Sequence, residues 1–251
     1  YIKEKANLPT GELIIESAKF FLGTPYVAHT LEIEPECLVI NLRELDCTTF
    51  LETVYALAMT VRSGEVTFEN YCNKLCSLRY RDVVINDYTD RLHYTSDWVY
   101  TNEKKGLINT VVNVSGSEPA NDSGFEQIRF NLNIMSSRPD LYKQLQGNEK
   151  LIEKVKAREV FLSSLTHYYL PTGNIEGNTK LLKNGDMVAF VTSIPGIDIS
   201  HVGIICFEGD KLTFIHASSS LKKVVTSEIP LTGYLLKNPK NTGIIVARAA
   251  F

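Results

Sequence analysis

The sequence of 251 residues lacks most of the features that assign a protein to a class at first reading. With a net charge of -3 at pH 7 and no long lysine and arginine tract, it gives no electrostatic case for nucleic-acid binding. No apolar run is long enough to span a bilayer. The five cysteines form an odd set without regular spacing, which does not indicate a disulfide framework. Repeats and low-complexity tracts are absent from the sequence.

The residues that are present predict an α+β protein with one domain over 1–251. Hydrophobic residues make up 44% of the chain, enough for a substantial core. Apolar residues at helical spacing predict helices over about 11–22, 50–61, 67–80 and 149–163. Alternating patterns predict strands near 187–193, 201–208, 211–218, 222–228 and 243–249. Helices first and an antiparallel sheet last are typical of the α+β class. Residues 81–147 follow neither pattern, and we interpret them as an insertion that shapes a site.

A single cysteine lies at the predicted start of the second helix. Asp46 is a good N-cap candidate because its carboxylate can accept a hydrogen bond from an unpaired backbone N–H. Cys47 would then lie in the first turn, where the positive end of the helix favours thiolate over thiol. The alternative is a small buried hydrophobic residue, which is the usual role of a free cysteine.

Two histidines lie on consecutive predicted strands. If Gly209-Asp210 is a two-residue hairpin turn, Glu208 pairs with Lys211. This register places His201 and His216 on one face of the sheet as diagonal neighbours, with backbones roughly 7–8 Å apart. A slip of one residue would send the two rings to opposite faces.

A cysteine at a helix start and two histidines on one sheet face are the parts of a thiol acyl-transfer site. Cys47 would attack a carbonyl carbon, and His201 would take the thiol proton and return it to the leaving amine. His216 would hold the imidazole of His201 in orientation. The backbone N–H of Cys47 could stabilise the oxyanion. Singly, each histidine is better explained by a structural role in the sheet, so the hypothesis depends on all three residues together.

A zinc hydrolase is an alternative reading of the same residues. Cys47, His201, His216 and Cys206 could be imagined as ligands. However, residues 201 and 206 are an odd number apart on one strand, so Cys206 is expected on the face opposite His201. We therefore expect neither metal nor cofactor.

Four segments together resemble the NlpC-type papain-like cell-wall peptidases in order and spacing. They are Gly23-Thr24-Pro25-Tyr26, Asp46-Cys47-Thr48-Thr49-Phe50, Ser200-His201-Val202-Gly203-Ile204 and Ile215-His216-Ala217. Thr48-Thr49 replaces the usual Ser-Gly after the cysteine, and Val27-Ala28-His29 replaces the usual aromatic residue and glycines. These departures resemble the N-acetylmuramoyl-L-alanine amidase-like branch. Further segments that resemble this branch are His93-Tyr94-Thr95-Ser96-Asp97-Trp98, Gly196-Ile197-Asp198-Ile199 and His216-Ala217-Ser218-Ser219.

The resemblance implies a papain-like core, in which an N-terminal helix bundle packs on a C-terminal antiparallel sheet or partly open barrel. The substrates it implies are peptidoglycan fragments, chiefly small anhydro-muropeptides cut between the lactyl group of N-acetylmuramic acid and L-alanine. It implies a metal-free reaction, a periplasmic setting and a monomer. Because the chain begins at Tyr1 rather than Met, we interpret it as the trimmed form of an exported precursor, soluble or a lipoprotein.

The resemblance also suggests substrate-binding residues. Tyr26 matches the family tyrosine near the nucleophile and is assigned to substrate or oxyanion contact; a turn tyrosine that covers the core is the alternative. Trp98 offers an apolar face for a sugar ring and Asp97 a hydrogen-bond acceptor, unless they are a buried aromatic residue and a capping aspartate. Ser200 and Ser218, which neighbour His201 in the predicted register, complete the set.

Two rival functions use the same fold. The first is cleavage of the γ-D-glutamyl to diamino-acid bond within the stem peptide, by the same three residues. A pocket for a free L-alanine amine would favour it, whereas a pocket for a disaccharide would favour the amidase. The second rival is a muropeptide-binding protein without turnover, which the presence of Cys47, His201 and His216 argues against.

Overall fold

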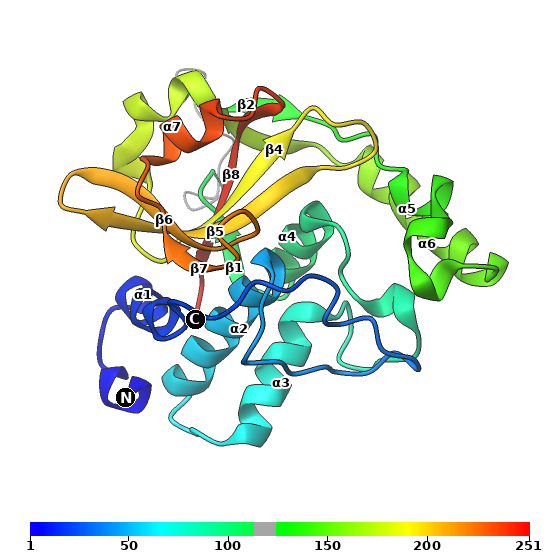
Figure 1. The fold of residues 1–251 in the computed structure, drawn as a ribbon, viewed down its shortest axis with the longest axis horizontal. Coiled ribbons are helices and arrows are strands. Elements are labelled where there is room, and N and C mark those ends of the chain that lie inside the picture. The colour runs from blue at the N-terminus through cyan, green and yellow to red at the C-terminus, as the bar shows by residue number, and fades with distance from the viewer. Residues whose placement is uncertain (113–123) are drawn as a thin grey trace.

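The computed structural model describes residues 1–112 and 124–251 as a mixed α+β fold (Figure 1). The α-helices are α1 (Thr10–Phe20), α2 (Cys47–Arg62), α3 (Phe68–Arg79), α4 (Thr95–Lys104), α5 (Ile134–Ser137), α6 (Glu149–Ser164) and α7 (Leu231–Leu236). The strands are β1 (Ile108–Thr110), β2 (Glu126–Ile128), β3 (His167–Pro171), β4 (Met187–Thr192), β5 (Ile199–Glu208), β6 (Lys211–Ser218), β7 (Lys223–Thr226) and β8 (Asn241–Ala249). Short 3-10 helices are η1 (Ile2–Lys5), η2 (Tyr88–Asp90), η4 (Pro139–Leu141), η5 (Lys143–Leu145), η6 (Thr172–Asn174) and η7 (Glu176–Leu181).

The strands form one open antiparallel sheet in the order β2-β3-β8-β4-β5-β6-β7. The long strand β8 pairs with β4 along one edge, and on the other edge with β3 near Gly243 and Ile244 and with β1 near its C-terminal end. The predicted α+β class is confirmed, and each of the five predicted strands is present within two residues of its expected bounds.

Both faces of the central strands are covered, which explains why β4 is buried at every position. Met187, Ala189 and Val191 face the core cluster around α1, α2 and α3, whereas Val188 and Phe190 face a second cluster that includes α7. Because side chains alternate across a strand, the sheet separates these two hydrophobic layers. Figure 1 shows α2 and α7 on opposite sides of the sheet.

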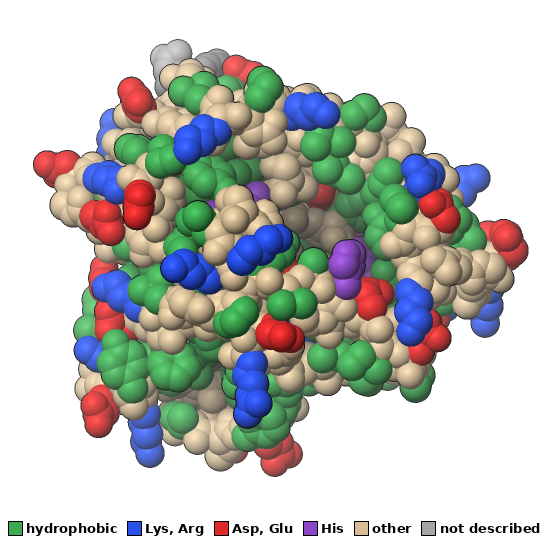
Figure 2. Space-filling view, viewed as in Figure 1, with side chains coloured by type: hydrophobic (Ala, Val, Ile, Leu, Met, Phe, Trp, Pro, Cys, Tyr) green, Lys and Arg blue, Asp and Glu red, His purple; other side chains and the backbone are tan. Residues whose placement is uncertain are grey.

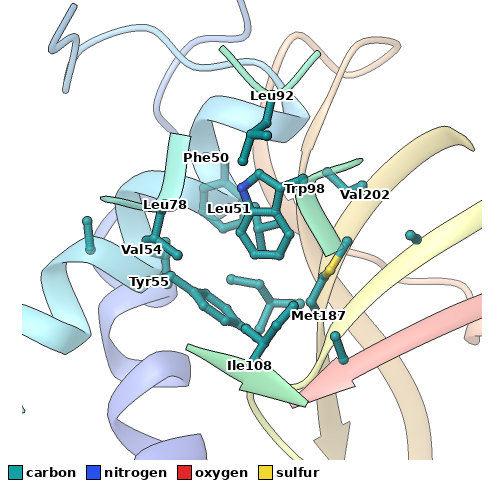
Figure 3. Packing of buried hydrophobic residues seen from close by; sticks show 14 of the residues in the cluster. Phe50, Leu51, Val54, Tyr55, Leu78, Leu92, Trp98, Ile108, Met187 and Val202 are labelled. Carbon is teal, nitrogen blue, oxygen red and sulfur yellow. The ribbon is translucent and has the colours of Figure 1, made fainter. Parts of the chain in front are cut away.

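Helix α2 is the central element of the first layer. Its N-cap is Asp46, whose carboxylate accepts the backbone N–H of Thr49 at 2.8 Å, and the hydroxyl of Thr49 accepts the N–H of Asp46 at 2.8 Å. This reciprocal pair is a capping box, and it fixes where the helix begins. Figure 3 shows apolar residues of α2 grouped with Trp98 and with Met187 and Val202 of the sheet. The predicted N-cap and helix are both confirmed.

The hairpin register is also confirmed. Glu208 pairs with Lys211, and the pairing continues without a shift to Ile204 and Ile215. One step further, Gly203 lies beside His216, where a Cβ on the glycine would come within 3.4 Å of the histidine Cβ. The register therefore brings His201 and His216 to one face.

The predicted insertion, 81–147, contains α4, β1, β2 and α5, and its residues 113–123 lie outside the described part of the chain. No helix in the described ranges is long and apolar enough to cross a membrane. Whether 81–147 is an insertion into one catalytic domain stays a prediction. Its residues do, however, line a cavity at the candidate site, as shown below.

Candidate active site

The two histidines are joined by a short hydrogen bond. Nε2 of His201 lies 2.7 Å from Nδ1 of His216, and the two ring planes are nearly perpendicular at 88°. His216 is almost fully buried with 1% exposure, whereas His201 is half-buried. His216 packs on the ring of Phe214, and His201 on that of Phe190, so aromatic neighbours hold both imidazoles.

Burial keeps both imidazoles neutral at neutral pH. It lowers the pKa of His201 to about 4, and burial together with the charge of His201 lowers the pKa of His216 to about 3. Each neutral ring has one donor and one acceptor nitrogen. If Nε2–H of His201 donates to Nδ1 of His216, Nδ1 of His201 keeps its lone pair. The pair is thus arranged so that the second ring nitrogen of His201 can serve as a base.

Cys47 is the first residue of α2, and its sulfur lies beside the start of β5. Hydrogen bonding from Val202 and Thr48 acts to lower the pKa of the thiol. Val202 directly follows His201 in the chain, so the start of α2 lies against the start of β5. The structure therefore brings together the segments that carry Cys47 and the histidine pair; their joint role in catalysis stays a prediction.

The expected thiolate is not the resting state, and that prediction was wrong. Burial, and next the negative charge of Asp46, raise the pKa of the Cys47 thiol to about 11. Hydrogen bonds from Val202 and Thr48 oppose this increase without overcoming it. The capping carboxylate thus offsets the effect of the positive helix end. At neutral pH the site holds a neutral thiol and a neutral imidazole, which requires proton transfer to accompany nucleophilic attack.

Tyr26 lies near the sulfur, as expected of a residue in contact with the reaction centre. Burial and then the charge of Cys47 raise its pKa. Its backbone N–H donates to the carbonyl of Lys222 at 2.9 Å, and it bridges to Leu45, which precedes Asp46. This arrangement joins the loop after α1 to both the β6–β7 connection and the start of α2.

The sequence analysis missed Tyr234. This half-buried tyrosine of α7 stacks on His201 with ring centroids 6.5 Å apart and an interplanar angle of 25°. It meets His216 edge-on at 5.4 Å, and the charge of Cys47 adds to burial in raising its pKa. No pattern in the sequence marks it, because a tyrosine on so short a helix shows no periodicity and lies well beyond His216 in the chain.

Asp97 and Trp98 are buried in the structure rather than presented to a ligand. Asp97 is bound by Arg81, at 2.9 and 3.0 Å, and by Arg158, whose Nε lies 3.0 Å from the carboxylate. Trp98 is 2% exposed and packs edge-on against Tyr55 in the core shown in Figure 3. A sugar ring has no access to this indole face. The geometry supports the structural alternative for both residues. Asp97 and Trp98 are core residues, and their assignment as substrate contacts was wrong.

The two serines also make structural contacts. The hydroxyl of Ser200 donates to the side-chain oxygen of Asn241 at 2.8 Å, which ties β5 to β8. The hydroxyl of Ser218, 2% exposed, lies 3.1 Å from that of Ser220 and accepts the N–H of Leu221 at 3.2 Å. Ser218 thus stabilises the β6–β7 connection.

A cavity of about 560 Å³ opens beside the nucleophile. Thr48 lines it at the start of α2, Tyr88 and His93 line it from the region before α4, and Asp198 lines it just before β5. The carboxylate of Asp198 accepts the N–H of Ser96 at 2.6 Å, and burial raises its pKa. Figure 2 shows that this face of the molecule is hollowed, with histidine side chains at the recess. The volume suits a ligand of drug-like or larger size, and we call this space the nucleophile-side cavity.

The zinc alternative requires a cluster of ligand side chains. Over residues 1–112 and 124–251, no group of three or more His, Cys, Asp and Glu side chains is placed to hold a metal ion. Cys206 belongs to the α2-side core, on the face of β5 opposite His201, as strand alternation predicted.

Comparison with known proteins gives a consistent result. A family model described as AmiA-like, N-acetylmuramoyl-L-alanine amidase-like, matches residues 16–244. No curated protein sequence matches the chain.

Several solved structures are similar to this chain over nearly its whole length. An N-acetylmuramoyl-L-alanine amidase from Bacteroides uniformis is 37% identical, with a TM-score of 0.89 over 96% of this chain and 99% of that one. A Bacteroides fragilis protein provisionally named a xylanase is 36% identical, with a TM-score of 0.85 over 93% and 99% of the two chains. A Legionella pneumophila protein, 22% identical with a TM-score of 0.71 over 99% and 92%, shares the fold.

Proposed function

Because the chain belongs to the N-acetylmuramoyl-L-alanine amidase-like family, we propose that it hydrolyses the amide bond between N-acetylmuramic acid and L-alanine by a thiol mechanism. The observation that carries the proposal is the 2.7 Å hydrogen bond between His201 and His216, on the strand whose next residue, Val202, lies at Cys47. Small anhydro-muropeptides, each a disaccharide bearing a stem peptide, are the proposed substrates. The chain would act as a monomer in the periplasm, exported as a soluble protein or a lipoprotein.

In the acylation step, Nδ1 of His201 takes the proton of the Cys47 thiol as the sulfur attacks the lactyl carbonyl carbon. The carbon–sulfur bond forms, and the carbonyl π electrons move onto oxygen. When this tetrahedral intermediate collapses, the carbon–nitrogen bond breaks and His201 gives its proton to the L-alanine amine. The products of this step are a muramoyl thioester on Cys47 and a free stem peptide.

In the deacylation step, water attacks the thioester carbonyl carbon while His201 accepts one of its protons. The carbon–sulfur bond breaks, the muramic acid carboxyl group is released, and the proton returns to the sulfur. His216 accepts the Nε2–H of His201 in both steps, which keeps the ring oriented and stabilises its transient positive charge.

The negatively charged oxygen of both tetrahedral intermediates needs hydrogen-bond donors. The first backbone N–H groups of a helix have no helical partner, so the N–H of Cys47 at the first position of α2 is one candidate donor. The hydroxyl of Tyr26, near the sulfur, is our candidate for the second. A helix-start cysteine facing histidines on a sheet also supports placing the fold in the papain-like, NlpC-type superfamily.

The function is tested by incubating the protein with a purified disaccharide-anhydro-tetrapeptide and analysing the products by mass spectrometry. We expect separate disaccharide and intact tetrapeptide, with a loss of rate on the order of 10³-fold or more in Cys47→Ala. Disaccharide that still bears L-Ala-D-Glu would instead establish the endopeptidase reaction. Full activity of Cys47→Ala would rule out the thiol mechanism.

A parallel incubation with xylan addresses the name of the Bacteroides fragilis relative. Glycoside hydrolysis commonly uses two carboxyl groups that flank the scissile bond. The side chain proposed to attack the substrate here is a thiol. We therefore expect no release of xylose oligomers, and their appearance would contradict the proposed reaction class.

A further inference from the structure

A second cavity, of about 440 Å³, opens on the histidine side of the site, and we call it the histidine-side cavity. It lies where β6 ends and β7 begins, next to α7. Its lining includes His216, Tyr234, Ser218, Lys223, Thr226 and Lys237. Its size is within the range of ligand pockets, and it shares no lining residue with the nucleophile-side cavity.

Each cavity is lined by a residue next to one of the proposed reacting groups. Thr48, which follows the nucleophile, lines the nucleophile-side cavity, whereas His216, the partner of the base, lines the histidine-side cavity. A substrate whose scissile bond is at Cys47 can therefore extend one half into each cavity. The two halves of a muropeptide differ in chemistry, so the cavities can be matched to them.

The two cavities differ in the charged side chains that line them. The nucleophile-side cavity is lined by Glu32, which is paired with Arg91, by Asp198, which accepts two backbone N–H groups, and by one lysine, Lys143. The histidine-side cavity contains Lys223 and Lys237 and one carboxylate, Glu228. A neutral glycan is bound well by carboxylates and tyrosine rings, which accept hydroxyl hydrogen bonds and cover apolar ring faces. An anionic peptide is bound better by the lysine pair.

The direction of the reaction gives the same assignment. The acyl half stays on the Cys47 sulfur after the first step, and the amine half departs with a proton from His201. The departing half must therefore begin on the histidine side of the scissile bond. In a muropeptide that half is the stem peptide, which carries free carboxylates.

We propose that the histidine-side cavity is the binding site of the departing stem peptide, with Lys223 and Lys237 contacting its carboxylates. The glycan-bearing acyl half occupies the nucleophile-side cavity. This assignment rests on the proposed function, and it adds the orientation of the substrate and two specificity-determining residues.

The backbone around Lys223 is held in place from both sides. Lys223 pairs with Ser218 within the sheet and bridges to Pro25 in the loop that carries Tyr26. The hydroxyl contacts of Ser218 close the connection between the two strands. The lysine is therefore presented from a fixed backbone next to the reacting groups, while its side chain stays exposed to a ligand.

The test compares charge reversals on the two sides of the site. The variants are Lys223→Glu, Lys237→Glu and their combination, with Lys143→Glu as the matched control in the nucleophile-side cavity. These lysines are all exposed, so thermal unfolding should be close to that of wild type. The substrates are a disaccharide-tetrapeptide with free carboxylates and the same molecule with its peptide carboxylates amidated.

We expect the double variant to raise KM for the free-carboxylate substrate by about tenfold, because two attractive charges become repulsive. Its kcat should change less than twofold, and so should its KM for the amidated substrate. Lys143→Glu should leave the ratio of the two KM values unchanged. An equal change in KM for both substrates in the double variant, or a change in the ratio of the two KM values in Lys143→Glu alone, would overturn the assignment.

A binding measurement separates this proposal from the proposed function. Free tetrapeptide is titrated into the Cys47→Ala protein by calorimetry, with and without the two lysine reversals. Binding that is lost in the double variant and retained with Lys143→Glu supports the peptide site even if no hydrolysis is seen. Hydrolysis by wild type together with unchanged peptide binding in the double variant would reject the site and leave the function intact.

Discussion

At the scale of single residues, the site is built so that neither reacting group is charged at rest. Burial lowers the pKa of His201 to about 4, while burial and Asp46 raise that of Cys47 to about 11. The imidazole is therefore available as a base over most of the acid range, and the thiol keeps its proton until a substrate arrives. In the proposed mechanism, attack and proton transfer are therefore coupled.

The acid side of the pH–rate profile follows from the histidine. His201 acts only when neutral, so kcat/KM should rise as pH increases through about 4 rather than through the ordinary histidine value near 6.5. The profile is measured from pH 3 to 8 on the disaccharide-tetrapeptide, with circular dichroism at each pH to confirm that the fold persists. An acid limb centred near 6.5 would mean that the imidazole is not desolvated in the working enzyme.

The two histidines should differ in how replaceable they are. In His216→Asn, the amide oxygen can still accept the Nε2–H of His201, so a loss of about tenfold in kcat is expected from poorer geometry. His201→Ala removes the base itself, with an expected loss on the order of 10³-fold. Steady-state kinetics of both variants show which substitution causes the larger loss of kcat. If His216→Asn were the more damaged, the roles of the two residues would have to be exchanged.

At the scale of secondary-structure elements, α7 is a short helix that buries Leu231 and Leu235 in the second core cluster and places the ring of Tyr234 on His201. Tyr234→Ala removes the stacking contact and admits water to His201, so we expect a loss of about tenfold in kcat and an acid limb moved upward toward the ordinary histidine pKa. Tyr234→Phe keeps the ring and should remain within about threefold of wild type. Equal losses in the two variants would show that the hydroxyl matters instead of the ring.

Asp46 at the start of α2 affects both the stability of the helix and the pKa of Cys47, and two variants can separate these effects. Asp46→Ala removes the cap and should lower the free energy of unfolding by about 1 kcal/mol, measured by urea denaturation. Asp46→Asn keeps an acceptor for the N–H of Thr49 but removes the charge, so its stability should be closer to wild type.

The same two variants should both lower the pKa of Cys47, because the negative charge that raises it is gone. The pH dependence of the alkylation rate of Cys47 measures this directly, with Cys47→Ala as the control for the other cysteines. An unchanged alkylation profile in Asp46→Asn would show that burial alone sets the thiol pKa.

The elements that follow local rules could be predicted from the sequence. The N-cap at Asp46 and the register of β5 with β6 depend on neighbouring residues and on turn length, so the contact between His201 and His216 followed without a structure. Asp97 could not be interpreted correctly, because its partners Arg81 and Arg158 come from distant parts of the chain. Tyr234 was missed for the same reason, since only packing brings it to the histidines.

At the scale of the whole molecule, the α+β class was predictable from the change of hydrophobic period along the chain. The two cavities were not, because each collects residues from several segments. The nucleophile-side cavity alone combines the loop before α2, the region around α4 and α5, and the start of β5. Its lining supports the expectation that 81–147 shapes the site, although the role of an insertion is still a prediction.

The proposed nucleophile and its proposed base also come from different layers of the molecule. Cys47 belongs to the α2 layer, and His201 and His216 pack with the aromatic residues of the α7 layer. A chain in which only one layer has formed would carry an ordinary thiol and isolated imidazoles. Under the proposed mechanism, hydrolysis requires both layers to be in place, so we expect an incompletely folded chain not to cleave the amide bonds around it.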